Sequence, residues 1–193
     1  MSCFHPIDCY RKIGGGVTFT RQNAYIDQPL KIPCGQCVGC RLERSRQWAI
    51  RCVHEASLYE HNSFITLTYD DENLPSDGSL HVEHFQKFMK RLRKKFGQNI
   101  RFYHCGEYGE QTFRPHYHAC LFNINFHDKK LWSQKNGNNL YNSEILSKLW
   151  PFGYAVIGDV TFQSAAYVAR YIMKKINGKN AQQHIQRNKF YLL

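Results

Sequence analysis

Two stretches decide the fold of this chain: residues 115–122, Pro-His-Tyr-His-Ala-Cys-Leu-Phe, and residues 64–69, Phe-Ile-Thr-Leu-Thr-Tyr. Both are rich in aromatic, β-branched and other apolar residues, which predicts two strands. The run 100–105 predicts a third strand, which pairs with 115–122 as an antiparallel hairpin joined by residues 106–113. A fourth strand is expected at 154–158.

Apolar spacing predicts the helices that cover these strands. In segment 82–96 the apolar residues recur every three or four positions, which indicates a helix with one buried face. These residues are Val82, Phe85, Met89, Leu92 and Phe96. We expect three more helices: a basic amphipathic one from Arg41 to about residue 59, a short one that Ser143 caps and that ends at Leu149, and a last one over 162–176 that ends at Gly178.

The order strand, helix, strand, strand, helix, strand, helix indicates an α+β protein. A central antiparallel sheet with helices packed on it, related to the ferredoxin or RNA-recognition type, fits this order. We divide the chain into a Cys-rich N-terminal appendage with a basic helix over 1–55, a main domain over 56–178 and a short basic and polar tail over 179–193. Residues 1–33 are expected to be irregular, and the Asn-rich stretch before residue 143 is expected to be a polar loop.

Composition favours an anionic partner. The 193 residues include 26 Lys and Arg against 15 Asp and Glu, a net charge of +11, and nucleic acid is the first candidate. Hydrophobic residues make up 42% of the chain, which excludes disorder over its whole length. No run approaches the roughly 18 apolar residues that span a bilayer, and the opening residues do not resemble a signal peptide. We therefore expect a soluble cytoplasmic protein without a membrane partner.

Two histidines form the first candidate site. His116 and His118 flank Tyr117 on a predicted strand, so both imidazoles point to the same face, about 6–7 Å apart along the strand. Glu107 or Glu110 can face them across the hairpin, and we prefer Glu107 because a strand end positions a side chain better than a loop. Such a set suits Mn²⁺ or Mg²⁺ bound to phosphate oxygens, and Zn²⁺ also accepts it. The alternative is two capping histidines and an exposed Glu.

Two tyrosines form the second candidate site. Tyr167 and Tyr171 stand four residues apart on the last predicted helix, and Arg170 and Lys174 each follow a tyrosine by three. At about 100° per residue all four lie within roughly a third of the circumference, opposite the apolar stripe of that helix. A nearby cation favours the phenolate, so the pair are candidate nucleophiles. The alternative is a pair of surface aromatics that pack against a loop.

Three elements in this order resemble the motifs of the HUH endonucleases: the strand at 64–68, His116-Tyr117-His118, and the helical segment 167–174. More closely, three further runs are similar to those of replication initiators of microviruses, especially gokushoviruses. These runs are Cys-Gly-Gln-Cys-Val-Gly-Cys-Arg at 34–41 followed by Trp48, Gly-Glu-Tyr-Gly at 106–109, and Arg-Pro-His-Tyr-His at 114–118. The resemblance covers roughly residues 33–178.

The resemblance implies a function for both sites. His116 and His118 would help to hold a divalent metal over the scissile phosphate of single-stranded or origin DNA. A tyrosine would attack that phosphate, leaving a 5′-phosphotyrosyl link and a 3′-OH that primes rolling-circle replication. Tyr171 is expected to cut first, because with Lys174 it reproduces the Tyr-x-x-Lys pattern of related single-tyrosine initiators. Residues 56–178 would then be the endonuclease domain, acting in the cytoplasm of a bacterial host beside the host replication helicase and polymerase.

The cysteines of the N-terminal region are candidate zinc ligands. Cys34, Cys37 and Cys40 are spaced by three residues, and regular thiolate spacing in a reducing compartment favours a structural zinc site. We expect Cys9, or else Cys3 or Cys52, to supply the fourth ligand. A cluster of free thiols without metal is the alternative.

Basic residues on the predicted helices and beside the hairpin are candidates for phosphate contacts, and a solvated basic face is the alternative. The candidates are Arg41, Arg44, Lys90, Arg91, Lys94, Arg114 and Arg170.

Three other functions compete with a nicking enzyme. A zinc-stabilised nucleic-acid-binding module without catalysis explains the charge and the cysteines, but leaves the tyrosine pair without a role. A single-strand transposase of the HUH type shares the chemistry, although such enzymes commonly use one tyrosine. A metal oxygenase of the cupin type normally carries Glu four residues after its His-x-His pair, where this chain has Phe122.

Overall fold

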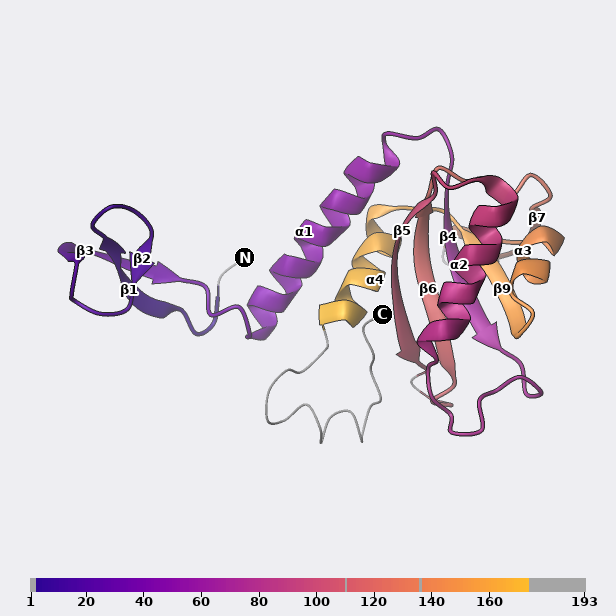
Figure 1. Cartoon of the computed structure of the whole chain (residues 1–193), viewed down its shortest axis with the longest axis horizontal. Helices are drawn as coiled ribbons and strands as arrows, with labels where there is room; N and C mark the ends of the chain where they lie inside the picture. The colour runs from indigo at the N-terminus through magenta and orange to yellow at the C-terminus, as the bar shows by residue number, and fades with distance from the viewer. Residues whose placement is uncertain (1–2, 110, 136, 174–193) are drawn as a thin grey trace. The chain divides into compact units, whose positions relative to one another are not determined.

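The structure is a computed structural model that describes residues 3–109, 111–135 and 137–173. The chain divides into two compact units, Met1–Ser45 and Arg46–Leu193, which we describe separately (Figure 1). Helix α1, Val38–Ala56, contributes its beginning to the first unit and its remainder to the second. Among the described residues, no helix is long and apolar enough to cross a membrane.

The first unit contains a small antiparallel sheet. Strands β1 (Ile7–Lys12), β2 (Val17–Thr18) and β3 (Ala24–Ile32) lie in the order β2-β1-β3. Three consecutive glycines, Gly14 to Gly16, all have positive φ in the turn between β1 and β2, a conformation that other residues rarely adopt. The expectation of an irregular segment was wrong here. The strands are mostly exposed, so they lack the apolar alternation by which a strand is recognised in sequence.

The second unit is built on a six-stranded antiparallel sheet in the order β5-β6-β4-β9-β8-β7. Its strands are β4 (Asn62–Tyr69), β5 (Arg101–Tyr108), β6 (Pro115–Phe122), β7 (Lys130–Lys135), β8 (Asn138–Asn142) and β9 (Gly153–Gly158). The four predicted strands are present, and the predicted α+β class is confirmed. The polar loop expected before Ser143 is instead the β7–β8 hairpin, whose Asn-rich strands carry little hydrophobic signal.

Four helices accompany the sheets: α1, α2 (Val82–Phe96), α3 (Glu144–Leu149) and α4 (Phe162–Met173). The bounds of α2 agree with the apolar spacing. Ser143 is the N-cap of α3, as predicted, and its hydroxyl accepts a hydrogen bond from the backbone N–H of Leu146. The predicted end of the last helix at Gly178 lies outside the described residues.

The two faces of the large sheet are covered by different helices (Figure 1). On one face α2 and α3 pack over alternate residues of the central strands, including the fully buried Leu67 and Tyr117. On the other face α4 and the last turns of α1 enclose a smaller cluster that contains Ala49, Cys120 and Val168. Because side chains alternate along a strand, the residues that flank Tyr117 point to the α4 face.

Tyr117 fixes this arrangement. Its hydroxyl accepts a hydrogen bond from the backbone N–H of His81, at 3.0 Å, and donates one to the carbonyl of the same residue, at 2.8 Å. His81 is the N-cap of α2 and makes no capping hydrogen bond with its own side chain. The side chain between the two candidate metal ligands therefore anchors the start of α2 on the opposite face.

Candidate functional site

The register of the sheet assembles the first site. Glu107 on β5 lies directly opposite His116 on β6, as the hairpin prediction required. The Oε1 atom of Glu107 is 2.6 Å from Nε2 of His116 and 3.1 Å from Nε2 of His118. Glu107 is 3% exposed and His118 8% exposed, so the group is shielded from solvent. The structure thus brings together the three predicted ligands, while Glu110 lies outside the described residues.

Helix α4 delivers a tyrosine to the same point. The hydroxyl of Tyr167 donates a hydrogen bond to Oε1 of Glu107 at 2.6 Å, and its ring meets that of His118 edge to face at 5.0 Å. Tyr171 lies one turn further along, with its ring 4.8 Å from that of Tyr167. Tyr167 is therefore the tyrosine in contact with the triad, and Tyr171 is its neighbour.

The tyrosines do not lie opposite the core, as the sequence predicted. Ala165, Val168 and Ala169 form the buried face of α4, whereas Phe162 is 42% exposed. Val168 lies beside both tyrosines on the helix, so the tyrosines border the buried face, and Tyr171 packs against the cluster beneath α4.

Hydrogen bonds on the far side of each imidazole orient the histidines. Nδ1 of His116 lies 3.0 Å from the carbonyl of Arg114, which can only accept, so Nδ1 carries the proton. Nδ1 of His118 lies 2.9 Å from the hydroxyl of Thr66. Carbonyl and hydroxyl partners of this kind hold metal-binding histidines in place.

This geometry fits a cation. With its proton on Nδ1, neutral His116 turns the lone pair of Nε2 toward the carboxylate of Glu107, and two acceptors at 2.6 Å need a proton or a cation between them. The second oxygen of Glu107, Oε2, is buried and has no hydrogen-bond partner among the described residues. Two imidazole nitrogens and a carboxylate with a spare oxygen are donors suited to Mn²⁺ or Mg²⁺.

The charges of the group also suit metal binding. Burial tends to raise the pKa of Glu107, but hydrogen bonds from His116, His118 and Tyr167 outweigh it and lower that pKa to about 2. Burial lowers the pKa of His118 despite the adjacent carboxylate. Burial, together with the hydrogen bond to Glu107, raises the pKa of Tyr167. Near neutral pH the site therefore holds an ionised carboxylate, a neutral His118 and a protonated phenol.

A second ligand group lies in the first unit. The sulfur atoms of Cys3, Cys34, Cys37 and Cys40 all lie within 4.8 Å of one another, with 3.7 Å between Cys3 and Cys37 and 4.0 Å between Cys34 and Cys40. A tetrahedral zinc ion with Zn–S bonds of about 2.3 Å separates its sulfurs by about 3.8 Å. The cluster therefore has the dimensions of a Cys₄ zinc site.

Backbone N–H groups point at these sulfurs and favour the thiolate. Those of Cys40 and Phe4 each lie 3.4 Å from the sulfur of Cys37 and lower its pKa to about 6. The fourth thiol is Cys3, which corrects the expected Cys9, because Cys9 is buried within β1 and stands outside this group. Spacing along the chain could not identify Cys3, since it lies 31 residues before Cys34.

The basic residues predicted to bind DNA fall into two sets. Arg41, Arg44, Lys90, Lys94 and Arg170 are exposed. Arg91 and Arg114 are half-buried: Nε of Arg91 donates to the carbonyl of Leu149 at 2.9 Å, and Arg114 donates to that of Tyr69 at 2.8 Å and pairs with Asp71. These two therefore also support the fold. Lys174 lies outside the described residues.

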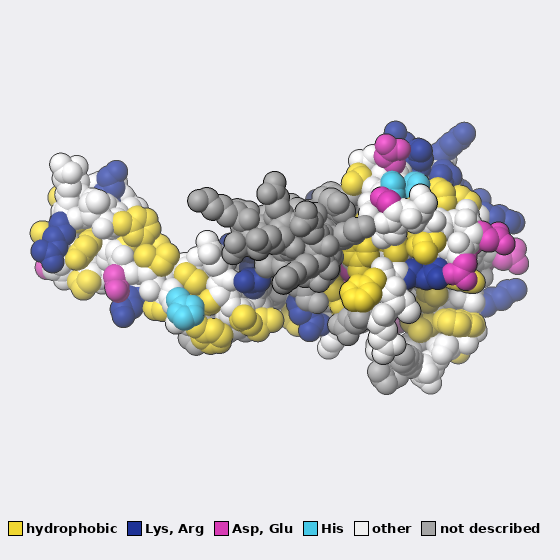
Figure 2. Space-filling model, turned by 90° about the horizontal axis from the view of Figure 1, so that it is seen from below, with side chains coloured by type: hydrophobic (Ala, Val, Ile, Leu, Met, Phe, Trp, Pro, Cys, Tyr) yellow, Lys and Arg dark blue, Asp and Glu magenta, His cyan; other side chains and the backbone are white. Residues whose placement is uncertain are grey.

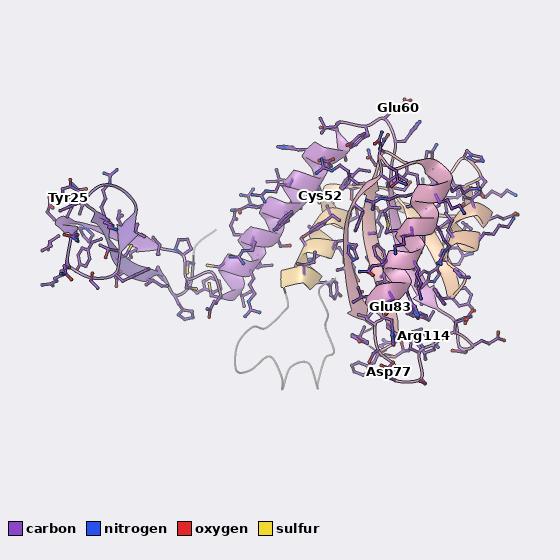
Figure 3. The ribbon with its side chains drawn as sticks, viewed as in Figure 1. Tyr25, Cys52, Glu60, Asp77, Glu83 and Arg114 are labelled. Atoms are coloured by element: carbon purple, nitrogen blue, oxygen red, sulfur yellow. The ribbon has the colours of Figure 1, made fainter. Side chains whose placement is uncertain are left out.

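The figures place this charge. Figure 2 shows Lys and Arg side chains around the rim of the second unit, with acidic side chains between several of them. Figure 3 labels Arg114 and Asp77 at the same end of the large sheet. Arg114 immediately precedes β6 and its backbone carbonyl orients His116, so this end of the sheet is the one that carries the histidine pair.

Fold and site together define an α+β protein that carries a candidate metal site of two histidines and a glutamate on an antiparallel sheet, with a helix tyrosine in contact with it. Residues 62–176 match the family model of the replication-associated protein ORF2, and the chain belongs to this family. The resemblance to phage replication proteins is thereby confirmed.

Relatives of the chain carry the same kind of description. It is 37% identical over 194 residues to "Replication-associated protein VP4" of Bdellovibrio phage phiMH2K, covering 95% of this chain and 61% of the relative. It is 41% identical over 160 residues to "Replication-associated protein ORF2" of Spiroplasma virus 4, covering 77% and 50%. It is 34% identical over 161 residues to "Replication-associated protein ORF4" of Chlamydia phage 1, covering 75% and 38%. The chain thus spans about half the length of these relatives. No solved structure matches it significantly.

Proposed function

We propose that this chain nicks single-stranded or origin DNA as a metal-dependent endonuclease and strand transferase of the HUH type, in the service of rolling-circle replication. One observation supports this most: the hydroxyl of Tyr167 and both imidazoles of the His-x-His pair lie within hydrogen-bonding distance of one oxygen of Glu107. A nucleophile beside a divalent-metal ligand set is what phosphoryl transfer requires. Membership of a family of replication-associated proteins agrees with this chemistry.

In the proposed reaction a tyrosine oxygen forms a bond to phosphorus while the bond from phosphorus to the 3′-oxygen breaks. The phenol gives up its proton, and the departing 3′-oxygen takes one up. The product is a 5′-phosphotyrosyl link that conserves the diester, so a later attack by a 3′-OH can rejoin the strand. A divalent cation at this site supplies positive charge that offsets the charge developing on the phosphoryl oxygens.

The residues around the site have separate parts in this scheme. Glu107 accepts the hydrogen bond of Tyr167 and so orients the phenol before attack. The carbonyl of Arg114 and the hydroxyl of Thr66 hold the two imidazoles in their tautomers. Tyr171 supplies a second nucleophile one turn away, which alternating cuts require. That Tyr171 cuts first, with Lys174 beside it, stays a prediction.

The remaining partners follow from this chemistry. A 3′-OH at a nick is a primer, so we propose the host replication helicase and polymerase as partners, in the cytoplasm of a bacterial host. We assign the cluster of Cys3, Cys34, Cys37 and Cys40 to a structural Zn²⁺ that stabilises the start of α1. Arg41 and Arg44 on that helix would then contact DNA phosphates.

Adduct formation tests the proposal. The full chain is incubated with end-labelled single-stranded origin DNA and Mn²⁺, and covalent adducts are resolved on a denaturing gel. Tyr167→Phe and Tyr171→Phe should each leave nicking by the other tyrosine, and the double variant should form no adduct. Tyr25→Phe, which removes an exposed hydroxyl in the first unit, is the matched control. Mass spectrometry of the trapped adduct identifies the linked residue.

Three outcomes separate the alternatives. An adduct that persists in the double tyrosine variant excludes both residues as nucleophiles. DNA binding without any adduct from the wild type, at all metal concentrations, favours a zinc-stabilised binding module without catalysis. Complete strand transfer by a variant that retains a single tyrosine favours a transposase of the single-strand type.

A further inference from the structure

A row of directly paired residues crosses the sheet from the metal-ligand group. Glu107 on β5 pairs with His116 on β6, His116 pairs with Thr68 on β4, and Thr68 pairs with Tyr154 on β9. These four strands are consecutive neighbours in the sheet (Figure 1). Directly paired residues point to the same face, so Tyr154 lies on the face that carries the triad. At about 4.8 Å per strand, Tyr154 is about 10 Å from His116.

Tyr154 differs from the other members of this row in its exposure. Its side chain is 67% exposed, although it lies on a strand inside the sheet, and within the described ranges it makes no hydrogen bond or ring contact. Trp132 on β7 is likewise 61% exposed and without a ring contact to the residues described. Large aromatic side chains left open beside a reaction site are typical of a surface that binds a partner.

A hollow joins these two aromatic residues. Strand β8 pairs with β9 only at Tyr141 and Ile157 among the described residues, so the outer edge of β9 beside Tyr154 is open. A cavity of about 910 Å³ lies there, and its lining includes Tyr154, Trp132, Lys130 and Lys148. Aromatic faces combined with ammonium groups suit a nucleotide, because bases stack on rings and phosphates pair with lysine.

We propose that Tyr154 and Trp132 form a base-stacking site for the single strand that runs across the sheet, at most about three stacked nucleotides from the phosphate at the triad. This inference rests on the proposed function, because it takes the triad as the position of the scissile phosphate. The occupant is single-stranded DNA because the hollow is continuous with the triad face and the chain carries a net charge of +11. Stacking tolerates any base, so the site sets the path of the strand and not its sequence.

Binding without cleavage tests the site. Fluorescence anisotropy in EDTA compares short oligo(dT) with an abasic strand of the same length, for the wild type, Tyr154→Ala, Trp132→Ala and Tyr154→Phe. Wild type and Tyr154→Phe should prefer oligo(dT), and each alanine variant should weaken oligo(dT) binding by about tenfold while leaving the abasic strand unaffected. Leu131→Ala, which removes an exposed apolar residue next to Trp132, should bind like the wild type.

Two results overturn the inference: both alanine variants bind oligo(dT) like the wild type, or they weaken the abasic strand equally. Melting curves confirm that each variant is folded. Because this assay contains no metal and needs no cleavage, it gives an answer even when the wild type forms no adduct. Conversely, a wild type that forms adducts while Tyr154→Ala binds oligo(dT) normally overturns the stacking site and leaves the proposed function intact.

Discussion

Replacing Thr66 by valine should weaken the binding of Mn²⁺ to Glu107, His116 and His118 by about ten- to hundredfold. The hydroxyl of Thr66 lies 2.9 Å from Nδ1 of His118. An imidazole that offers the lone pair of Nε2 to a cation must carry its proton on Nδ1, and there the Thr66 hydroxyl accepts it. Valine has nearly the same shape but cannot accept a hydrogen bond.

The magnitude follows from burial. His118 is 8% exposed, so water has little access to replace the lost acceptor. A buried donor left without a partner costs about 1–3 kcal/mol, which corresponds to roughly 5- to 150-fold in affinity. Losing an outer partner of a metal-binding histidine typically costs 10–100-fold, in the same range. Without metal the ring can move its proton to Nε2 and donate to Glu107, so the loss falls mainly on the metal-bound state.

Titration of the full chain with Mn²⁺, followed by calorimetry or by the electron paramagnetic resonance of free Mn²⁺, measures this affinity. Thr68→Val is the matched control, because Thr68 points to the same face of β4 and its hydroxyl makes no hydrogen bond within the described part of the chain. Affinity of Thr66→Val within about twofold of the wild type would refute the reasoning. Equal losses in both valine variants would attribute the effect to β4 as a whole.

Three further predictions concern the rest of the chain. Cys3→Ser should release close to one zinc per chain and lower the melting temperature, whereas Cys9→Ser should retain the metal, as elemental analysis would show. Burial lowers the pKa of His104 to about 4, so the unfolded state takes up its proton first. The stability that neutral His104 provides is complete above about pH 6.5 and falls by about 3 kcal/mol toward pH 4. Denaturant unfolding should show this fall in the wild type and a flatter profile in His104→Leu. Gly153 has a φ of 141°, and a Cβ there would overlap the backbone of β4, so Gly153→Ala should destabilise by about 3 kcal/mol. Gly158→Ala, where the nearest atom is at 3.6 Å, should unfold close to the wild type.

Local sequence determined the elements whose signal lies within a few residues. The apolar spacing of 82–96 and the strand at 115–122 agree with the structure at both ends, and Ser143 caps its helix as predicted. The alternation around Tyr117 placed both histidines on one face before any partner was known. These features depend on periodicity and capping, which neighbouring residues encode.

Tertiary structure alone decided how distant residues meet. The N-terminal sheet and the β7–β8 hairpin carry weak local signals and form through backbone pairing. Cys3 joins its cluster across 31 residues, and Tyr167 reaches Glu107 across 60, so Tyr167 and not Tyr171 contacts the triad. Strand register and helix packing fix such contacts, because they depend on the burial of surfaces from separate segments. No local pattern of residues records which distant partner will cover them.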